Sequence, residues 1–591
     1  MNLNDSPESW LSEIIQSEKT KRAAGISLLA GMGLCMVLLI LPLPAYASLP
    51  FAALIIFAFA FCCLYANKLS LFSVNTGLII TILCLALAAI GIFSYLRGWQ
   101  WLESAHASEM VLARLLAQEN TLLSANWRYS TELRLVNQTI FTMPLFKLLG
   151  RLENWALIRS MNIVLNNIVL ILSYVFMMKQ TRIHLKWILI SCFFLILPLS
   201  YEYWNIVTFG GYYIFFMAKL FCCLGLFIKL CSNDDTIQSA LPVFILFSML
   251  SFVLGVHGIR ALLAVHVPLL IAVIYLWSKM APAKRLPLFL GCYAFVLCCF
   301  GYLVSYLLSL RFSVYSYDTM RSEYLANYLQ KLGLSLMNIA GFFGLLADVP
   351  LLSAQGLFSL AAIAGAFILL WALYKLVRKE QGRQQFIPVF FAASLVFNIF
   401  VFVVTVSSIT PRFFFPFMVL YIPLTALLFH HAEKAYGQLK RTAVVWGIIL
   451  FLFGQGFLNF QSLAAKDINS IRKGHIQYLL DEGLEFGIAV FWNANVITEL
   501  SNGKIDMAGL EHATGRAGAN PFSIFGYLVQ EKHYDPFHHL GESFLLLNRN
   551  EWDMYRHGQV FSGMQPDYQD EHFVVLRYES ADVMYAEVMG M

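Results

Sequence analysis

Apolar segments about twenty residues long recur along this chain of 591 residues, and they constrain its fold more than any other feature. A helix of that length spans the hydrocarbon core of a bilayer, where a chain must satisfy its backbone hydrogen bonds internally. Hydrophobic residues make up 59% of the chain and charged residues 13%, whereas soluble domains have roughly half and a quarter. The sequence therefore predicts a polytopic α-helical membrane protein.

We expect about thirteen transmembrane helices, because each of these runs is long enough to cross a bilayer. The runs are residues 23–45, 50–66, 74–95, 159–178, 187–201, 211–230, 239–256, 261–278, 286–310, 353–376, 387–408, 413–431 and 442–459. A shorter apolar stretch at 332–347 is typical of a re-entrant or interfacial helix.

The placement of Lys and Arg predicts the orientation, because cytoplasmic loops carry the excess of these residues. With residues 1–22 in the cytoplasm, alternate loops bring the basic clusters to that side: Lys68 and residues 179–186, 279–285, 375–383 and 434–441. The transmembrane domain then comprises residues 23–459. Its loops 96–158 and 311–352 and the residues 460–591 face outward.

Residues 460–591 change in character, with many charges and turn residues and no spanning run. The segment GIAVFWNANVITELSNGKIDMAGL (487–510) predicts a strand, a helix, an Asn-Gly turn and a second strand. ESFLLLNRNEWDMY and HFVVLRYES each add a candidate strand. We therefore expect a small C-terminal extracytoplasmic α/β domain.

The loop 96–158 contains the candidate acids. Glu103 follows the third apolar run, and Glu109 lies six residues later. A carboxylate at the membrane surface can deprotonate an acceptor hydroxyl as that hydroxyl attacks the anomeric carbon of a sugar. The alternative is that both acids are solvated charges on an interfacial helix.

Two arginines at the outer ends of spans are candidates for a lipid-linked phosphate. Arg260 lies in GVHGIR, with His257 beside it, and Arg412 lies in SSITPRFFFP. A guanidinium group binds phosphate oxygens through two parallel N–H groups. The alternative is an arginine that extends to lipid headgroups.

Glu202 stands among aromatic residues in YEYWNIVTFGGYY. This pattern suits a sugar-facing surface, but it is more commonly the aromatic belt at a membrane interface. The spans contain few ionisable residues, which argues against an ion-coupled transporter. None of the eleven cysteines has the spacing of a metal site, so no cofactor is indicated. No nucleic-acid partner is expected.

The layout of the chain resembles the GT-C superfamily of integral-membrane glycosyltransferases, in particular the aminoarabinose and protein O-mannosyl transferases. Two segments carry a sharper resemblance to bacterial GT-C-like proteins: WLESAHASEMVLARLLAQENTLLSANWRYSTELRLVNQ (101–138) and FWNANVITELSNGKI (491–505). The resemblance implies an inverting glycosyltransferase of the bacterial inner membrane. Its donor would be a polyprenyl-phosphate sugar and its acceptor an extracytoplasmic glycan or lipid, for example in lipopolysaccharide or another surface polysaccharide.

The resemblance also implies roles for residues. The catalytic acid of the family lies where the first long loop opens, which corresponds to Glu103, with Glu109 next. The arginine for the donor phosphate corresponds to Arg260 or Arg412. Many such loops carry a second Asp close behind the first acid, where this chain has Ala105 and His106, so a metal requirement stays open. The substrate pocket would be shaped by Trp127, Arg128, Tyr129 and Glu132.

Two other functions stay open. An O-antigen polymerase or ligase has its large loop late in the chain and lacks a C-terminal domain, whereas this chain has an early loop. A lipid or glycan flippase without catalysis would tolerate the loss of Glu103 and Glu109, but it would need a continuous polar path through the bundle.

Overall fold

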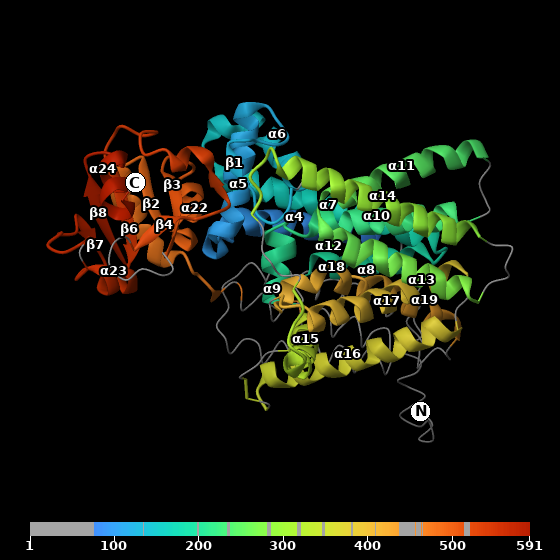
Figure 1. Ribbon diagram of the computed structural model, residues 1–591. Coiled ribbons are helices and arrows are strands. Elements are labelled where there is room, and N and C mark those ends of the chain that lie inside the picture. Colours follow the sequence, from blue (N-terminus) through green and yellow to red (C-terminus); the bar gives the residue numbers. More distant parts are fainter. Residues whose placement is uncertain are drawn as a thin grey trace, which may run out of the picture.

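The computed structural model describes residues 76–133, 135–197, 200–232, 237–279, 285–315, 321–345, 349–350, 352–379, 382–407, 409–435, 456, 463, 465–512, 521–558 and 560–590. The predicted N-terminal segment, the runs at 23–45 and 50–66 and all but one residue of the run at 442–459 lie outside these ranges. Within them, a bundle of long helices carries a smaller domain of sheet and helices at one end (Figure 1).

Each apolar run predicted between residues 74 and 431 coincides with a helix or with consecutive helices. These are α4 (Thr76–Arg97), α7 (Trp155–Gln180), α8 (Leu185–Ile196), α10 (Ile214–Leu230), α11 (Ile237–Val256), α12 (Ile259–Ala261) with η6 (Leu262–His266) and α13 (Val267–Trp277), α14 (Leu286–Ser309), α16 (Ala354–Lys379), α17 (Arg383–Val404), and α18 (Phe415–Met418) with α19 (Tyr421–Ala435). Helix α15 (Tyr328–Phe342) covers most of the shorter apolar stretch.

By length and composition, five helices of the described part of the chain can cross a membrane. The number becomes six if α8 and the helical segment Tyr201–Phe209, which meet at 93°, form one broken span. Two further apolar helices, Ala240–Val256 and Phe415–His431, are shorter. The predicted count of about thirteen is therefore not confirmed, although the helical membrane architecture is.

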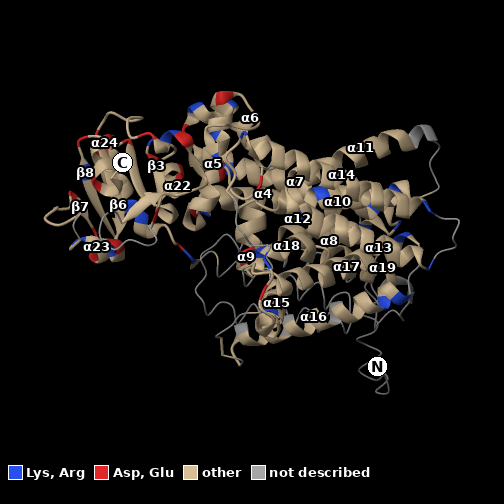
Figure 2. Ribbon diagram, viewed as in Figure 1, with Lys and Arg blue, Asp and Glu red and all other residues tan. Residues whose placement is uncertain are grey.

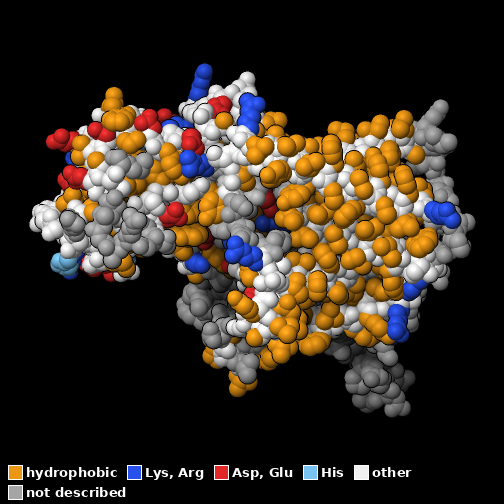
Figure 3. Space-filling view, viewed as in Figure 1, with side chains coloured by type: hydrophobic (Ala, Val, Ile, Leu, Met, Phe, Trp, Pro, Cys, Tyr) orange, Lys and Arg blue, Asp and Glu red, His pale blue; other side chains and the backbone are white. Residues whose placement is uncertain are grey.

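Apolar side chains cover the face of the bundle that Figure 3 shows. Leu303 and Leu307 on α14 and Phe367 on α16 are each more than half exposed. A soluble domain rarely exposes so large an apolar surface, whereas lipid tails solvate it. The bundle therefore suits a bilayer.

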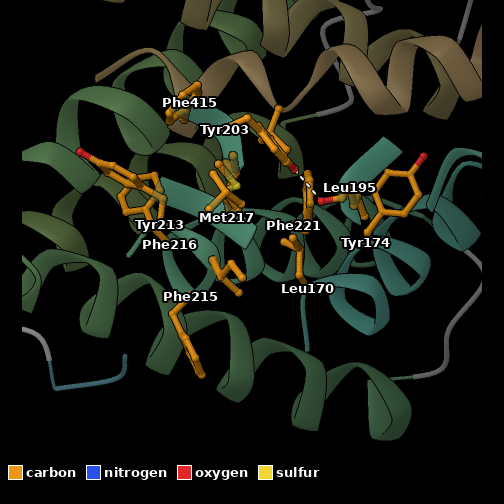
Figure 4. Packing of buried hydrophobic residues seen from close by; sticks show 14 of the residues in the cluster. Leu170, Tyr174, Leu195, Tyr203, Tyr213, Phe215, Phe216, Met217, Phe221 and Phe415 are labelled. Carbon is orange, nitrogen blue, oxygen red and sulfur yellow. Dashed lines mark hydrogen bonds between the residues drawn. The ribbon is translucent and has the colours of Figure 1, made fainter. Parts of the chain in front are cut away.

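Large aromatic side chains fill the interior of the bundle (Figure 4). Tyr203 is fully buried, its hydroxyl donates to the carbonyl oxygen of Leu195 (2.7 Å), and its ring lies 5.9 Å from that of Phe415. A buried hydroxyl needs such a partner, because an unmet hydrogen bond costs about 1–3 kcal/mol. These contacts join the segment around residue 203 to the start of α18.

The predicted loop 96–158 is folded. It contains η3 (Gly98–Trp101), α5 (Ser104–Glu119), β1 (Trp127–Arg128), α6 (Thr139–Leu149) and η4 (Gly150–Leu152). In Figure 1, α5, α6 and β1 lie between the long helices and the C-terminal domain.

The C-terminal domain is built on a six-stranded sheet with the order β4-β3-β2-β6-β8-β7. Its strands are β2 (Phe486–Val490), β3 (Asp506–His512), β4 (Phe522–Ile524), β6 (Ser543–Asn548), β7 (Tyr568–Gln569) and β8 (Phe573–Tyr578). The helices are α21 (Lys473–Asp481), α22 (Phe491–Leu500), α23 (Arg549–Tyr555) and α24 (Ala581–Met589), preceded by η9 (Ser470–Arg472). The small α/β domain expected from the sequence is confirmed.

The predicted order of strand, helix, turn and strand corresponds to β2, α22 and β3. Asn502 and Gly503 form the turn, and both have positive φ angles (55° and 75°), a backbone region that Asn and Gly tolerate better than other residues. Strand β2 pairs in parallel with both β3 and β6. A parallel pair needs a crossover between its strands, and α22 supplies it.

Helix α22 also docks the C-terminal domain onto the bundle, because it packs against α5. At this interface the Arg159 guanidinium of α7 donates to both carboxylate oxygens of Glu499 (2.5 and 2.6 Å) and to the carbonyl oxygen of His106 (3.0 Å). Both charged side chains are more than nine-tenths buried. Strand β1 adds a second link by pairing with β5 (Val529–Gln530).

The two ends of the bundle differ in charge. Helix α7 contacts the C-terminal domain in its first turns and carries Lys179 in its last turn. Its 26 residues are about 39 Å long at about 1.5 Å per residue, so Lys179 lies at the far end. Figure 2 shows further Lys and Arg at that end, whereas the acidic residues gather around the C-terminal domain.

Candidate active site beside the C-terminal domain

Glu103 occupies the N-cap position of α5, and Leu102 separates it from the short helix η3. Its backbone carbonyl accepts from the amides of His106 and Ala107 (both 3.0 Å), but its side chain makes no capping hydrogen bond. An N-cap carboxylate commonly binds the free amides of the first turn. The Glu103 carboxylate is instead available to other groups.

A buried tryptophan holds the turn before Glu103. Trp101 is fully buried, and its ring centroid lies 5.1 Å from that of Phe93 and 5.8 Å from that of Trp204. Its indole nitrogen donates to the carbonyl oxygen of Leu463 (2.8 Å). These contacts attach the start of the predicted loop to the bundle, so the backbone that carries Glu103 is in a fixed place.

Glu202 lies in the segment that crosses this end of the bundle. Helix α9 (Tyr201–Tyr203) is capped by Ser200 and continues as the π-helical turn η5 (Trp204–Phe209). The buried ring of Tyr203 packs against the ring of Phe415 and so holds α9 against α18 (Figure 4). As a result, the amide nitrogen of Asn205 lies 3.5 Å from the Glu103 carboxylate, and the charges of Glu202 and Glu103 act on each other. Short π-helical turns occur often at functional sites.

Three cations from distant parts of the chain act on the Glu103 carboxylate: Arg412, Lys466 and Arg472. Lys466 is also placed by an aromatic ring, since its ammonium nitrogen lies 3.8 Å from the centroid of Tyr201. We call Glu103, Glu202, Asn205, Arg412, Lys466 and Arg472 the Glu103 site.

The environment of Glu103 raises the pKa of its carboxyl above the usual value of 4.5. Burial is the largest cause, because it disfavours the charged form. The hydrogen bond from Asn205 and the charges of Lys466, Arg472 and Arg412 oppose this effect. A carboxylate with a raised pKa is a better proton acceptor, which suits a general base.

Arg260 lies close to this site but already has an anionic partner. Its guanidinium pairs with the carboxylate of Glu132 (3.0 Å) and donates to the hydroxyl of Tyr213 (2.6 Å). The guanidinium groups of Arg260 and Arg412 both lie near the ring of Phe413, at 5.8 and 5.3 Å from its centroid. The structure thus brings the two predicted phosphate-binding arginines together, with Arg412 exposed and Arg260 paired.

His257 contacts a buried lysine that the sequence analysis did not single out. The ammonium nitrogen of Lys219 on α10 lies 2.9 Å from Nε2 of His257 and donates to the carbonyl oxygen of Val136 (3.1 Å). The position of Lys219 within the apolar run 211–230 is the sequence signal that could have identified it, because a lysine inside a span usually has a functional or structural partner.

Glu109 faces a different part of the surface from Glu103. Six residues along an α-helix correspond to about 9 Å and about one and two thirds turns. Glu109 lines a small open pocket whose wall is formed by Leu112, Leu116, Leu122, Leu123, Trp127, Tyr129, Ser130, Glu132, Asn137, Thr139 and Leu528. The predicted site residues therefore form two neighbouring groups, with Glu132 and its partner Arg260 between them.

Arg128 belongs to the domain interface. Its guanidinium donates to both carboxylate oxygens of Glu531 (2.7 and 2.8 Å) and lies 3.4 Å from the ring centroid of Tyr534. Arg128 is not among the pocket residues above, in contrast to Trp127, Tyr129 and Glu132. Among the described residues, no group of three or more His, Cys, Asp or Glu side chains is arranged to hold a metal ion.

Sequence reasoning missed Lys466, Arg472 and Asn205 in addition to Lys219. Lys466 and Arg472 follow the last apolar run, where charged residues are common. Asn205 lies in the motif around Glu202, but nothing in the sequence indicates that its side-chain amide contacts Glu103, about a hundred positions earlier. A polar residue within an aromatic cluster is the one signal that favoured it.

No protein-family model matches the chain, and no curated protein matches it. Among solved structures, ArnT from Cupriavidus metallidurans is similar to this chain, both in the apo state and bound to undecaprenyl phosphate. The TM-score is 0.51 and the identity 11%, over 84% of this chain and 98% of that chain. The oligosaccharyltransferase from Archaeoglobus fulgidus has a TM-score of 0.46 and 9% identity, over 78% of this chain and 68% of that chain. The similarity to ArnT extends over most of both chains and shows a shared fold.

Proposed function

We propose that this chain, which has the GT-C fold, is a membrane glycosyltransferase that transfers a sugar from a polyprenyl-phosphate donor to a glycan or lipid acceptor. The observation that carries the proposal is the Glu103 site, where the half-buried Glu103 carboxylate meets the side-chain amide of Asn205 (3.5 Å) and three cations act on its charge. ArnT, whose fold this chain shares, was crystallised with undecaprenyl phosphate, which supports a donor of this class.

In the proposed reaction, Glu103 accepts the proton of an acceptor hydroxyl while the hydroxyl oxygen attacks the anomeric carbon of the donor sugar. The bond between this carbon and the phosphate oxygen breaks, and the polyprenyl phosphate leaves with the electron pair. The exposed cations Arg412 and Lys466 stabilise the negative charge on the leaving phosphate. A single displacement of this kind inverts the configuration at the anomeric carbon.

The donor would reach the site from the bilayer. Its apolar chain would lie against the exposed apolar side chains of the bundle (Figure 3), and its phosphate would meet Arg412, which is exposed and close to the acids. Arg260 and His257 would support the phosphate from the adjacent cluster. Glu202, with Trp127, Tyr129 and Glu132 of the neighbouring pocket, would contact the sugar or the acceptor.

The charge difference between the two ends supports an orientation with Lys179 and the other basic clusters in the cytoplasm. The Glu103 site and the C-terminal domain would then face the periplasm of a bacterial inner membrane. Modification of lipopolysaccharide or another surface polysaccharide is the biological setting that we propose.

Membranes that contain the chain, supplied with a panel of polyprenyl-phosphate sugars, test this function. We expect labelled sugar to appear on an envelope glycan or lipid and free polyprenyl phosphate to form in equal amount. Absence of transfer from every donor by folded protein, together with movement of labelled lipid between leaflets, would contradict the proposal and favour a flippase.

The raised pKa of Glu103 predicts the pH dependence of transfer. The base must be ionised, and its ionised fraction falls as the pH drops through its pKa. Because the pKa is raised above 4.5, the acidic limb of kcat/KM should have its midpoint above pH 4.5. A profile of initial rates between pH 4 and 9 measures this midpoint, and a midpoint at or below 4.5 would argue against Glu103 as the base.

The two arginines beside Phe413 should respond differently to substitution. Arg412→Gln removes an exposed cation, so we expect KM for the donor to rise by about tenfold to a hundredfold with normal thermal stability. Arg260→Gln leaves Glu132, whose side chain is 13% exposed, without this cation, so we expect loss of stability as well. Donor-dependent kinetics and thermal melts of purified protein separate these effects, and equal melting temperatures in the two variants would contradict the distinction.

A further inference from the structure

The segment FWNANVITELSNGKI, which the sequence analysis singled out and the proposed chemistry does not use, forms α22 and the turn after it. Several polar side chains of α22 are buried rather than exposed to solvent. Asn493 and Glu499 are each 6% exposed and Asn495 is 3% exposed. Buried polar side chains are retained where they have partners, so the partners of this helix indicate its role.

Asn469 binds the turn that carries Glu103. Its side chain is fully buried, and its amide nitrogen donates to the carbonyl oxygens of Trp99 (2.6 Å) and Leu102 (2.9 Å). The neighbouring amide of Ile468 donates to the carbonyl oxygen of Gln100 (2.9 Å). Three carbonyl groups of the four residues before Glu103 therefore bind to the segment that leads into the C-terminal domain.

Arg472 continues this connection into the C-terminal domain. Its Nη1 donates to the side-chain oxygen of Asn469 (2.7 Å), and its Nη2 donates to the side-chain oxygen of Asn493 on α22 (2.7 Å). The guanidinium is planar and holds its donors at fixed angles. Arg472 therefore ties α22 to Asn469, and through Asn469 to the turn before Glu103.

Helix α22 also binds the first residue of α5, since the amide of Val496 donates to the hydroxyl of Ser104 (3.2 Å). The backbone on both sides of Glu103 is thus attached to the C-terminal domain or to the segment that leads into it. The Nε of Arg472 is buried and has no hydrogen-bond partner among the described residues, while the charge of Arg472 acts on Glu103.

We infer that Asn469, Arg472 and Asn493 are positioning residues for Glu103, and that through them the docked C-terminal domain holds the carboxylate at the acceptor hydroxyl. We call these three residues the clasp. The inference rests on the proposed role of Glu103 as base. It gives the C-terminal domain a task in catalysis, because a reacting group displaced by about 1 Å can lose a hundredfold in rate.

Asn493→Ala tests the clasp, because Asn493 contacts Arg472 and not Glu103. We expect kcat to fall by at least about tenfold with KM for the donor unchanged. We also expect the acidic limb of the pH profile to move to higher pH. The charge of Arg472 lowers the pKa of the Glu103 carboxyl, and a loosened Arg472 would lower this pKa less. Arg472→Gln should move this limb further, and Arg472→Lys, which keeps the charge, should return it toward the wild-type position without restoring kcat.

Lys504→Gln is the matched control. Lys504 follows α22 and pairs with Glu153 of the membrane domain (3.1 Å), but both side chains are more than half exposed and lie outside the clasp. We expect this variant to keep the kcat and the pH profile of the wild type. If the role of Asn493 were purely structural, Asn493→Ala would lower the amount of folded protein, as other interface variants do. The acidic limb of its pH profile would stay at the wild-type position.

Amide hydrogen exchange of residues 99–106 tests the clasp without an activity assay. We expect faster exchange there in Asn493→Ala than in Lys504→Gln or the wild type, because the turn loses its link to α22. If folded wild-type protein transfers no sugar, the proposed function fails, while the exchange rates still decide whether the turn depends on Asn493. The inference would be overturned if Asn493→Ala had the same kcat, the same acidic limb of the pH profile and the same amide exchange rates as the wild type.

Discussion

Glu103→Gln should reduce kcat for sugar transfer by about a hundredfold to ten-thousandfold, which is the contribution of a well-placed general base. Glutamine keeps the shape of the side chain and its contact with Asn205, but it cannot accept the proton. The four other charged groups of the Glu103 site stay in place, so KM for the donor should change little. Initial rates with a polyprenyl-phosphate sugar and purified protein in lipid vesicles give both constants.

Two acids on the same helix serve as comparisons. Glu109→Gln should alter KM for the acceptor more than kcat, because Glu109 lines the neighbouring pocket. Glu119→Gln, near the end of α5, should retain wild-type kinetics, since its carboxylate contacts Asn126 and Thr121, away from the Glu103 site. Full activity in Glu103→Gln, or a larger loss of kcat in Glu109→Gln, would show that the base is assigned to the wrong residue.

Arg159→Met should destabilise the attachment of the C-terminal domain by about 3–5 kcal/mol, the cost of leaving one charge of a buried pair without its partner. The Glu499 carboxylate would stay buried after the change, and the carbonyl oxygen of His106 would lose the hydrogen bond from Arg159. We expect a lower melting temperature, and proteolysis between the bundle and the domain should become faster than in the wild type. Both are measured on protein in detergent or nanodiscs.

The double variant Arg159→Met/Glu499→Met separates the pair from its surroundings. Replacing both charges by apolar side chains of similar volume is often neutral or stabilising, so the double variant should melt at a higher temperature than either single variant. A double variant as unstable as the sum of the two singles would show that the two residues act independently. In that case the buried pair would not be the main link between α7 and α22.

The helices and the succession of strand, helix, turn and strand at 487–510 were predictable, because both depend on local patterns. Long apolar runs become helices wherever they lie in a bilayer. In the C-terminal domain, the alternation in GIAVFWNANVITELSNGKIDMAGL and the Asn-Gly pair were sufficient to predict β2, α22, the turn at 502–503 and β3. The number of crossings was less predictable, because length and composition do not decide whether α8 and the segment Tyr201–Phe209 form one broken span.

The partners of the site residues were not predictable in the same way. Apolar helices in lipid are hydrophobic on all sides, so periodicity carries little information about which helices are neighbours. In the sequence, Arg260 and Arg412 have equivalent positions at the outer ends of spans, whereas the structure pairs Arg260 with Glu132 and leaves Arg412 exposed. The sequence places Arg128 beside the predicted pocket residues Trp127 and Tyr129, but the structure pairs it with Glu531, about four hundred residues later.

The sequence by itself determined that this chain forms a helical membrane domain with a small α/β domain at its C-terminal end, and that an acid begins the first long loop. Length and apolarity decide the first, the alternation of strands and turns decides the second, and the position of Glu103 after an apolar run decides the third. Tertiary structure alone decided which cations act on the charge of Glu103. Lys466 and Arg472 lie more than 360 positions from it in the chain. The buried hydrogen bonds of Asn469 to the turn before Glu103 and of Arg472 to α22 hold the segment that carries them in this place.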